Sequence, residues 1–359
     1  MKKLFKNIFL LALIGAVVSI IVSACFPIYW GDDIQISKIN NYKQNTTKYN
    51  ALFFGGSLEY RHISPAILNK DLAKQNIDLK GYNFGVDSHN FIQATNEAEY
   101  VVKNFKNDSL KYLFISLSTE AYLATSNLHS NKLICWMNIH SVSQLLKTLT
   151  KLKDEALPRA IFAGGYLMSW FENAFNFGKL KDKILYIINK DNINTVAIGE
   201  DKDGFVPLEL NEHGQVANPE TEVGKYVLMI SNIMYKNNTS RLDFFNKLIF
   251  DTYRDSTKQN KNVDYLYSIC NKMIDKYKAQ GIKVIFFIPP RVPSGYKQIV
   301  PLYNKLPDGN KFNLASPDKY PEFYEVKYGF DNFHMDRSGA EIYSHKMAIE
   351  LAKILPQSK

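Results

Sequence analysis

The sequence predicts an α/β fold, a doubly wound parallel sheet of the three-layer, flavodoxin-like type with a large central insertion. Two observations predict it. Short, continuous apolar runs, which are typical of strands covered on both faces, alternate with stretches of helical periodicity. The alternation is present near both ends of the chain, and at this interval it implies right-handed crossovers between parallel strands.

The first strand is predicted at Ala51–Phe54, where four apolar residues stop at Gly55 and Gly56. A strand that ends in small residues lets the backbone turn sharply and presents the next side chain, Ser57, at the carboxyl edge of the sheet. That edge is where open α/β sheets bind ligands. Ser57 is therefore the first candidate site residue.

The following elements alternate between helix and strand. Ser64 and Pro65 are typical of a cap and a first helical residue, and they predict a helix that continues to Leu72. Further strands are predicted at Gly81–Val86, Tyr112–Leu117 and Lys283–Ile288, and further helices at Phe91–Phe105 and Tyr265–Ala279.

A second candidate site lies near the C-terminus, in the motif Asp331-x-x-His334. A spacing of three brings a carboxylate and an imidazole to the same side of one turn, and a serine nucleophile needs a base that a third group orients. Ser338 to Glu341 has capping-box spacing and predicts the start of a final helix. The pair is therefore expected on a loop held by a helix.

Composition bounds the functional classes. The chain has 359 residues, of which 46% are hydrophobic and 22% charged, as is ordinary for a globular protein with a large core. The formal charge of +9 favours an anionic partner, such as membrane phosphate or an acidic glycan. Nucleic acid is not expected, because no basic cluster with interleaved aromatic residues is present and the N-terminus indicates export.

The N-terminus, residues 1–30, is predicted to be a signal anchor or a lipoprotein signal. Three lysines in the first six residues precede an apolar run from Ile8 to Trp30, long enough to span a bilayer. Val22-Ser-Ala-Cys25 resembles a bacterial lipobox, which would leave a lipidated Cys25. The apolar continuation Phe26–Trp30 favours the anchor, because a lipoprotein usually continues with a polar tether. Either way, the rest of the chain is expected on the extracytoplasmic side, tethered to a membrane.

Beyond the anchor, residues 31–48 are predicted to be a polar tether, and residues 49–359 a single α/β domain. The insertion, at about residues 157–255, is expected to shape a cleft or a partner surface, or to be a structural elaboration without substrate contact. Cys135 and Cys270 belong to no metal-binding motif, so no metal site is expected. They form either one disulfide or two buried free thiols.

Three motifs together resemble the SGNH (GDSL-like) hydrolase and acyltransferase family: Phe54-Gly-Gly-Ser57, Asn83-Phe-Gly85 and Asp331-x-x-His334. The sequences around these motifs are similar to those of membrane-tethered members that take part in O-acetylation of surface polysaccharides. The resemblance covers residues from about 50 to 153 and from about 263 onward. It implies a surface polysaccharide or acylated glycan as substrate, an acyl-donating integral membrane protein as partner, and no cofactor.

The resemblance also assigns roles. Ser57 would be the nucleophile, His334 the base and Asp331 the residue that orients it, while the backbone N–H groups of Ser57 and Gly85 would form an oxyanion hole. Where many members have Gly-x-Asn-Asp, this chain has Ser116-Leu-Ser-Thr-Glu120. Ser118 or Thr119 would supply the additional donor, or that donor is absent.

Two functions from different classes follow. The first is a serine esterase or O-acetyltransferase that acts on a cell-surface glycan. The alternative is a catalytically inactive glycan-binding or assembly protein on the same fold. His62 and His89, which lie near the motifs, are expected to be structural or cleft-wall residues because neither has a carboxylate at a useful spacing.

Overall fold

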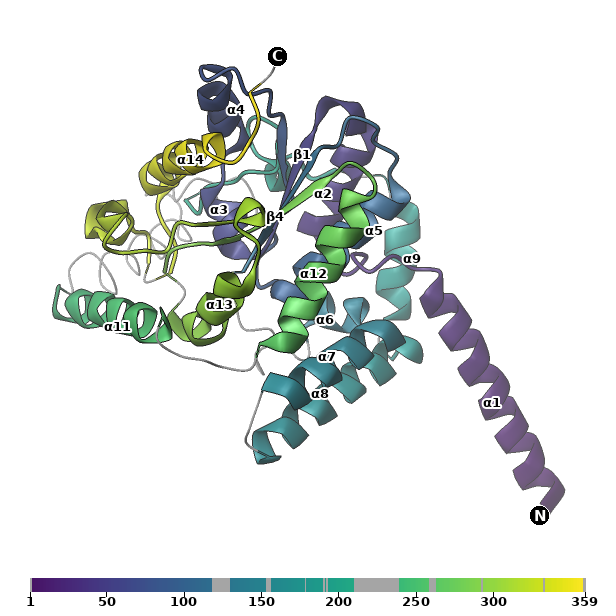
Figure 1. The fold of residues 1–359 in the computed structure, drawn as a ribbon. Coiled ribbons are helices and arrows are strands. Elements are labelled where there is room, and N and C mark those ends of the chain that lie inside the picture. The colour runs from purple at the N-terminus through teal and green to yellow at the C-terminus, as the bar shows by residue number, and fades with distance from the viewer. Residues whose placement is uncertain are drawn as a thin grey trace, which may run out of the picture. The chain divides into compact units, whose positions relative to one another are not determined.

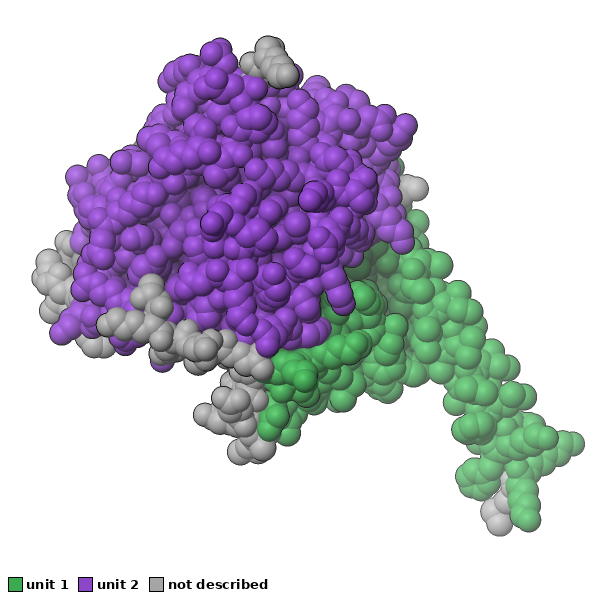
Figure 2. All heavy atoms as spheres, in the orientation of Figure 1, with its two compact units in different colours: residues 1–36, 122–192 green, residues 37–121, 193–359 purple. Residues whose placement is uncertain are grey.

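The computed structural model describes residues 2–117, 130–152, 156–177, 179–189, 191, 193–209, 239–257, 263–291, 293–331 and 333–357. The chain divides into two compact units (Figure 2). Unit 1 comprises residues 1–36 and 122–192, and unit 2 comprises residues 37–121 and 193–359. The two candidate motifs both belong to unit 2.

Unit 2 is built on an all-parallel, five-stranded sheet. Its strands are β1 (Ala51–Phe54), β2 (Gly81–Asn83), β3 (Tyr112–Ser116), β4 (Lys283–Ile288) and β5 (Lys311–Asn313). Their order, β2-β1-β3-β4-β5, is that of a doubly wound sheet, with the direction of winding reversed between β1 and β3. The predicted α/β fold with a doubly wound parallel sheet is therefore confirmed.

Helices cover both faces of this sheet (Figure 1). The helices that lie wholly in unit 2 are α3 (Ser57–His62), α4 (Pro65–Ala73), α5 (Phe91–Asn104), α11 (Thr239–Thr257), α12 (Asp264–Lys278), α13 (Pro293–Lys305) and α14 (Arg337–Ala352). α11 packs with α13 and lies away from the strands. A salt bridge of 3.4 Å from Lys276 to Glu99 joins α12 to α5, and α14 packs with α4 on the other face. Because both faces are covered, every residue of β1 is fully buried, as its apolar run predicts.

Most predicted elements of unit 2 are confirmed within a few residues. In α4, Pro65 is the first residue and the Ser64 hydroxyl accepts a hydrogen bond from the N–H of Ile67. The predicted capping box of the last helix is wrong. The cap is Asp336, whose carboxylate accepts from the N–H of Gly339 at 2.9 Å, because the preceding loop ends at a β-bridge between Gly329 and Met335.

The predicted tether differs from the structure. Residues Asp33–Gln44 form a helix, α2, in which Ile39 and Tyr42 are buried. Ile36, Ile39 and Tyr42 recur every three residues, a helical signal that the surrounding Asn, Lys and Gln residues obscure. The chain therefore enters the folded body well before the first strand.

Unit 1 is helical in its described residues. It contains α1 (Lys2–Ala24), α6 (Asn131–Trp136), α7 (Ile139–Leu152), α8 (Ala156–Ala174) and α9 (Leu180–Asn189). α1 has 23 residues, none of them buried, and is long and apolar enough to cross a membrane. The predicted insertion divides between the units, because α8 and α9 belong to unit 1 and residues 193–209 and α11 to unit 2.

Candidate active site

Ser57 is the first residue of the short helix α3, which follows β1 at the carboxyl edge of the sheet. The turn between them is held by Glu59, whose carboxylate accepts a hydrogen bond from the N–H of Gly56 at 2.7 Å. The first N–H groups of a helix have no acceptor within the helix and suit a negatively charged oxygen. The hydroxyl and the N–H of Ser57 are thus placed beside the point where the winding of the sheet reverses.

Asn83, at the end of β2, is hydrogen-bonded to α3 and to the residue that follows it. Its buried side-chain amide donates to the carbonyl oxygens of Glu59 at 2.7 Å and Ile63 at 2.8 Å. One side chain therefore holds two points of the helix that carries Ser57. Asn83 belongs to a predicted motif, but its two hydrogen bonds to α3 and the following residue were not predicted. A polar amide at the end of a buried strand was the one signal in the sequence that could have indicated them.

Asp331 and His334 lie in a tight loop whose shape depends on Asp331. Its carboxylate Oδ1 accepts hydrogen bonds from the N–H groups of Phe333 and His334, both at 2.7 Å. The carbonyl oxygen of His334 in turn accepts from the N–H of Phe330 at 2.9 Å. The carboxylate that is expected to orient His334 therefore also shapes the loop.

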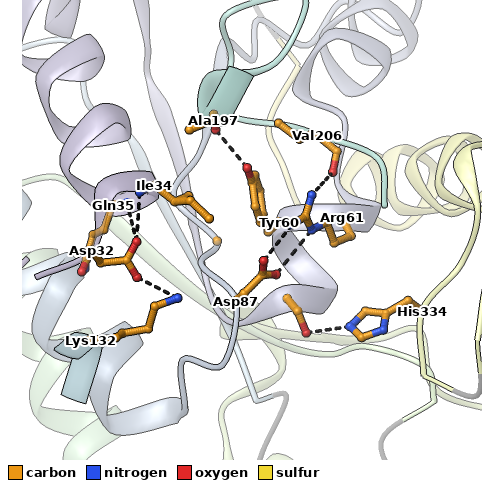
Figure 3. Close-up of polar contacts among 12 residues, drawn as sticks. Asp32, Ile34, Gln35, Tyr60, Arg61, Asp87, Lys132, Ala197, Val206 and His334 are labelled. Carbon is orange, nitrogen blue, oxygen red and sulfur yellow. Dashed lines mark hydrogen bonds and ion pairs between the residues drawn. The ribbon is translucent and has the colours of Figure 1, made fainter. Parts of the chain in front are cut away.

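The structure brings Ser57, His334 and Asp331 together. Nε2 of His334 lies 2.8 Å from Oγ of Ser57, and Nδ1 of His334 lies 2.9 Å from Oδ2 of Asp331; the bond between the His334 ring and the serine hydroxyl is drawn in Figure 3. With the proton on Nδ1, the ring donates to the carboxylate and accepts from the hydroxyl. This is the geometry of an activated nucleophile with an oriented base.

The electrostatics of the pair favour an ionised carboxylate. Burial acts to raise the pKa of Asp331, but the hydrogen bond and charge of the His334 ring, together with the two backbone N–H groups, outweigh it. The pKa of Asp331 is therefore below its usual value. An ionised Asp331 stabilises the imidazolium that forms when His334 accepts a proton.

His62 connects the two motifs structurally. Its Nε2 accepts a hydrogen bond at 2.8 Å from the N–H of Met335, the residue after His334. Ser344 on α14 adds a second connection, because its hydroxyl accepts from the N–H of Ser64 and donates to the carbonyl of His62. Burial, followed by the charge of the neighbouring His334, lowers the pKa of His62 well below its usual value. A neutral His62 can therefore serve as the acceptor that aligns the loop.

Arg291, which no sequence signal identified, supports the same loop from the side of β4. It is buried, and its backbone has a φ of 64°, in the left-handed region. Its guanidinium donates to three carbonyl oxygens, those of Phe323, Glu325 and Asp331. A guanidinium suits this task because it presents several donors in a fixed plane.

Gly85, an expected oxyanion donor, has a different set of contacts. Its N–H donates to Oδ1 of Asn83 at 2.8 Å, and its carbonyl accepts from Nζ of Lys38 at 2.6 Å. A Cβ at this position would lie 2.4 Å from the backbone nitrogen of Tyr60, so only glycine allows β2 to approach α3 this closely. Because its N–H is already paired, Gly85 does not offer a free donor here, and the N–H of Ser57 is the expected donor that remains among the described residues.

Charged side chains are buried behind α3. Arg61 forms a salt bridge of 2.7 Å with Asp87 and lies over the ring of Tyr60 (Figure 3). Lys38 lies over the same ring, with its Nζ 3.7 Å from the centroid, and burial lowers its pKa well below the usual value. These contacts help to fix the orientation of α3.

Part of the predicted insertion also contacts α3, which begins with Ser57, and α14, which follows the loop of Asp331 and His334. The hydroxyl of Tyr60 on α3 donates to the carbonyl of Ala197 at 3.2 Å (Figure 3). The N–H of Arg337, the first residue of α14, donates to the carboxylate of Glu209 at 2.6 Å. Residues 193–209 therefore contact the helix that carries Ser57 and the helix that follows His334.

His89 has a carboxylate neighbour that the sequence analysis did not find. Its Nδ1 lies 3.6 Å from Oε2 of Glu97, and both side chains are buried. The two residues are eight apart, with Glu97 on α5 and His89 just before it. His89 therefore lies in the core of unit 2. The reason for expecting this was wrong, because His89 does have a carboxylate neighbour, Glu97.

The remaining candidates are placed as follows. Ser118 and Thr119 lie outside the residues that the structure describes. Cys25 is exposed just after α1, and Cys135 and Cys270 are buried free thiols, one in each unit. Burial raises the pKa of both buried thiols, that of Cys135 to about 12. Among the described residues, no group of three histidine, cysteine or acidic side chains could hold a metal ion.

Comparison with known proteins does not identify a family. No family model matches the chain, and no curated protein matches it.

Proposed function

We propose that the protein is a membrane-tethered serine esterase or O-acyltransferase that removes or transfers an acetyl group on a cell-surface glycan. The observation that carries the proposal is the hydrogen-bonded series from Ser57 through His334 to Asp331. A hydroxyl, a base and an orienting carboxylate in this order are the parts that acyl transfer needs.

In the first half of the reaction, Oγ of Ser57 attacks the acyl carbonyl carbon while Nε2 of His334 accepts the hydroxyl proton. Asp331 holds the Nδ1–H tautomer and stabilises the imidazolium. The negatively charged oxygen of the tetrahedral intermediate is placed near the N–H of Ser57 at the start of α3. Collapse of the intermediate releases the alcohol, which takes the proton back from His334 and leaves an acyl-serine.

In the second half, His334 takes a proton from the acceptor hydroxyl as that hydroxyl attacks the acyl-serine. The bond from the acyl carbon to Oγ of Ser57 then breaks, and His334 returns the proton to the serine oxygen. Water as acceptor gives deacetylation, and a sugar hydroxyl gives transfer. Both outcomes use the same three residues, so the acceptor decides which reaction is observed.

The glycan and the acetyl group come from the resemblance to the SGNH family and from the formal charge of +9, which suits an acidic polymer near a membrane. α1 supports the tether, because it has the length and the apolar surface of a membrane-spanning helix. The glycan would reach the enzyme from the extracytoplasmic side.

Contacts within unit 1 favour an uncleaved anchor over a lipoprotein. The hydroxyl of Ser23 donates to the carbonyl of Asn173 at 2.7 Å, and the side-chain amide of Asn176 donates to the carbonyl of Ser19. Cleavage before Cys25 would remove both residues of α1 from these contacts. Lipidation of Cys25 is therefore the less favoured alternative.

A second candidate function is a glycan-binding or assembly protein without catalysis. One observation favours it: the N–H of Gly85 is paired with Asn83, which leaves the N–H of Ser57 as the one unpaired expected oxyanion donor among the described residues. Loss of one such donor typically lowers the rate on the order of a hundredfold or more. A binding protein would retain glycan affinity but hydrolyse no ester.

The two candidates are separated by assaying the full chain in detergent with a chromogenic acetyl ester and with an acetylated oligosaccharide. The proposal expects release or transfer of acetyl that is lost in Ser57→Ala. Ser109→Ala, a change at an exposed serine before β3, is the matched control and should leave activity intact. Glycan binding without acetyl turnover in the wild-type protein would favour the second candidate.

A further inference from the structure

The exposed side of α8 in unit 1 is apolar. Ile161, Leu167, Met168 and Phe171 are between 41% and 56% exposed, and they recur at the spacing of one helical face. The opposite side carries the buried polar residues Ser169 and Asn173 beside Phe162 and Tyr166. A helix in contact with water has the reverse arrangement, with its polar residues outside.

α9 has the same inverted pattern. Ile184, Leu185, Ile187 and Ile188 are between 45% and 70% exposed. The charged Lys183 is buried instead, with its Nζ 2.9 Å from the hydroxyl of Ser23 and in contact with the side chain of Asn176. Burying a lysine and exposing four large aliphatic side chains is unfavourable in water, but it suits a helix whose outer face is covered by an apolar medium.

The position of these helices within unit 1 points to that medium. Asn173 and Asn176, at the end of α8, are hydrogen-bonded to Ser23 and Ser19 in the last turns of α1. At about 1.5 Å per residue, the 23 residues of α1 extend about 34 Å, close to the roughly 30 Å of a bilayer's hydrocarbon core. Ser19 and Ser23 would therefore lie near the outer border of that core, and the end of α8 and the start of α9 lie at the same depth.

Aromatic and basic residues gather at this border. The ring of Phe26, just after α1, lies 5.9 Å from Tyr186 of α9 and 5.5 Å from Trp30. Lys181 is exposed at the start of α9. Aromatic rings with polar tips, together with lysines, are typical of protein segments at the headgroup level of a membrane.

We propose that the apolar face of α8 and α9, defined by Ile161, Leu167, Phe171, Ile184, Ile187 and Ile188, lies in the outer leaflet of the membrane that α1 crosses. The protein would then be held by a spanning helix and by two interfacial helices beside it. The proposal depends on the membrane anchor of the proposed function. The favoured occupant is lipid, because the end of α8 and the start of α9 are hydrogen-bonded to the last turns of a helix that is itself suited to lipid.

The test uses the full chain, reconstituted in phosphatidylglycerol–phosphatidylethanolamine vesicles, with Cys25→Ser as background. An environment-sensitive fluorophore is attached at a single new cysteine, in Ile161→Cys, Phe171→Cys or Ile188→Cys. Lys147→Cys, on the exposed polar side of α7 in the same unit, is the matched control. Val17→Cys, in the middle of α1, reports whether the anchor is inserted.

The proposal expects a blue-shifted emission at the three face positions, several-fold less quenching by aqueous iodide than at Lys147, and strong quenching by lipids brominated near the headgroup. Val17 should respond instead to lipids brominated near the chain ends. If Val17 is buried in lipid but the face positions are quenched by iodide as strongly as Lys147, the inference is wrong and the anchor stands. If Val17 is also open to iodide, the anchor itself is wrong.

Two other outcomes would overturn the assignment to lipid. Shielding of the face that disappears as the protein is diluted in lipid would indicate a second copy of the chain as its occupant. Shielding in native membranes that is absent in pure lipid vesicles would indicate a partner membrane protein.

Discussion

Nε2 of His334 lies 2.8 Å from Oγ of Ser57, although 277 positions separate the two residues in the chain. Hydrogen bonds hold both the helix that carries Ser57 and the loop that carries His334. Asn83 holds the helix that begins with Ser57, and His62 accepts a hydrogen bond from the residue that follows His334. The pair is thus positioned by buried hydrogen bonds rather than by an isolated surface contact.

The first prediction separates the roles of His334 and Asp331. His334→Ala should lower the turnover of a model acetyl ester by on the order of 10²–10⁴-fold or more, because Ser57 loses its proton acceptor. Asp331→Asn should be less damaging, since the amide oxygen can still accept from the backbone N–H groups that shape the loop. Turnover is measured at saturating ester, with circular dichroism to verify the fold.

Double variants test whether the three residues act as a unit. Combining His334→Ala or Asp331→Asn with Ser57→Ala should lower turnover little further than Ser57→Ala alone, because effects within one catalytic unit are not additive. Near-normal turnover in His334→Ala would remove the proposed mechanism and favour the binding-protein alternative.

A second prediction concerns Gly85. Gly85→Ala places a Cβ about where the backbone of Tyr60 lies, so β2 and α3 must separate. Overpacking of this kind costs about 1–3 kcal/mol, and the displacement of α3 should also lower esterase activity. Chemical denaturation measures the first effect and ester turnover the second.

Gly164→Ala is the control for this experiment. Gly164 is exposed on α8, and a Cβ there meets nothing within 4 Å. Replacement of a helical glycine by alanine should stabilise the protein by about 0.5–1 kcal/mol. Equal stability and activity in Gly85→Ala and the wild type would contradict the close packing of β2 against α3.

A third prediction is a pH dependence of stability from Asp203. Burial raises the pKa of this carboxyl to about 6, against the hydrogen bonds from the N–H groups of Phe205 and Ala66. The folded state therefore binds a proton more tightly than the unfolded state, and the resulting stabilisation is lost as the pH rises from about 4 to 6. At about 1.4 kcal/mol per pKa unit, the loss is about 2–3 kcal/mol.

The measurement compares the free energy of unfolding of the wild type with that of Asp203→Asn across this range. The difference between the two should change with pH as stated, because the variant lacks the titrating group. Parallel pH profiles would show that Asp203 has the same pKa in the folded and unfolded states.

A fourth prediction concerns the N-terminus. Because Ser19 and Ser23 bond to α8, we expect the mature protein to retain α1. Intact-mass analysis of membrane-extracted protein should therefore include residues before Cys25. A mass that begins at a diacylglyceryl-modified Cys25 would contradict the anchor and favour the lipoprotein alternative.

The sequence was sufficient for the elements with strong local signals. The apolar runs at Ala51–Phe54 and Lys283–Ile288 are strands with those boundaries. Short apolar runs flanked by turn residues are typical of buried strands. β5 was missed, since three residues beginning with Lys311 give too short a pattern. The paired motifs around Ser57 and His334 were located, because each has a recognisable spacing.

The supporting contacts could not be read from the sequence. Asn83, Arg291 and His62 act through hydrogen bonds to residues that are distant in the chain or to carbonyl groups, which carry no sequence signal. The cap of the last helix was predicted at Ser338, from its capping-box spacing to Glu341, and not at Asp336, where the structure has it. Local patterns therefore identified the candidate reacting groups, whereas the contacts that hold them depend on the tertiary fold.

The most direct test is labelling of the full chain with a fluorophosphonate, which reacts with serines activated by a base, followed by peptide mass analysis. The account predicts a single labelled residue, Ser57, and no labelling in folded Ser57→Ala or His334→Ala protein. Labelling that persists in Ser57→Ala, or an unlabelled but folded wild-type protein, would contradict it.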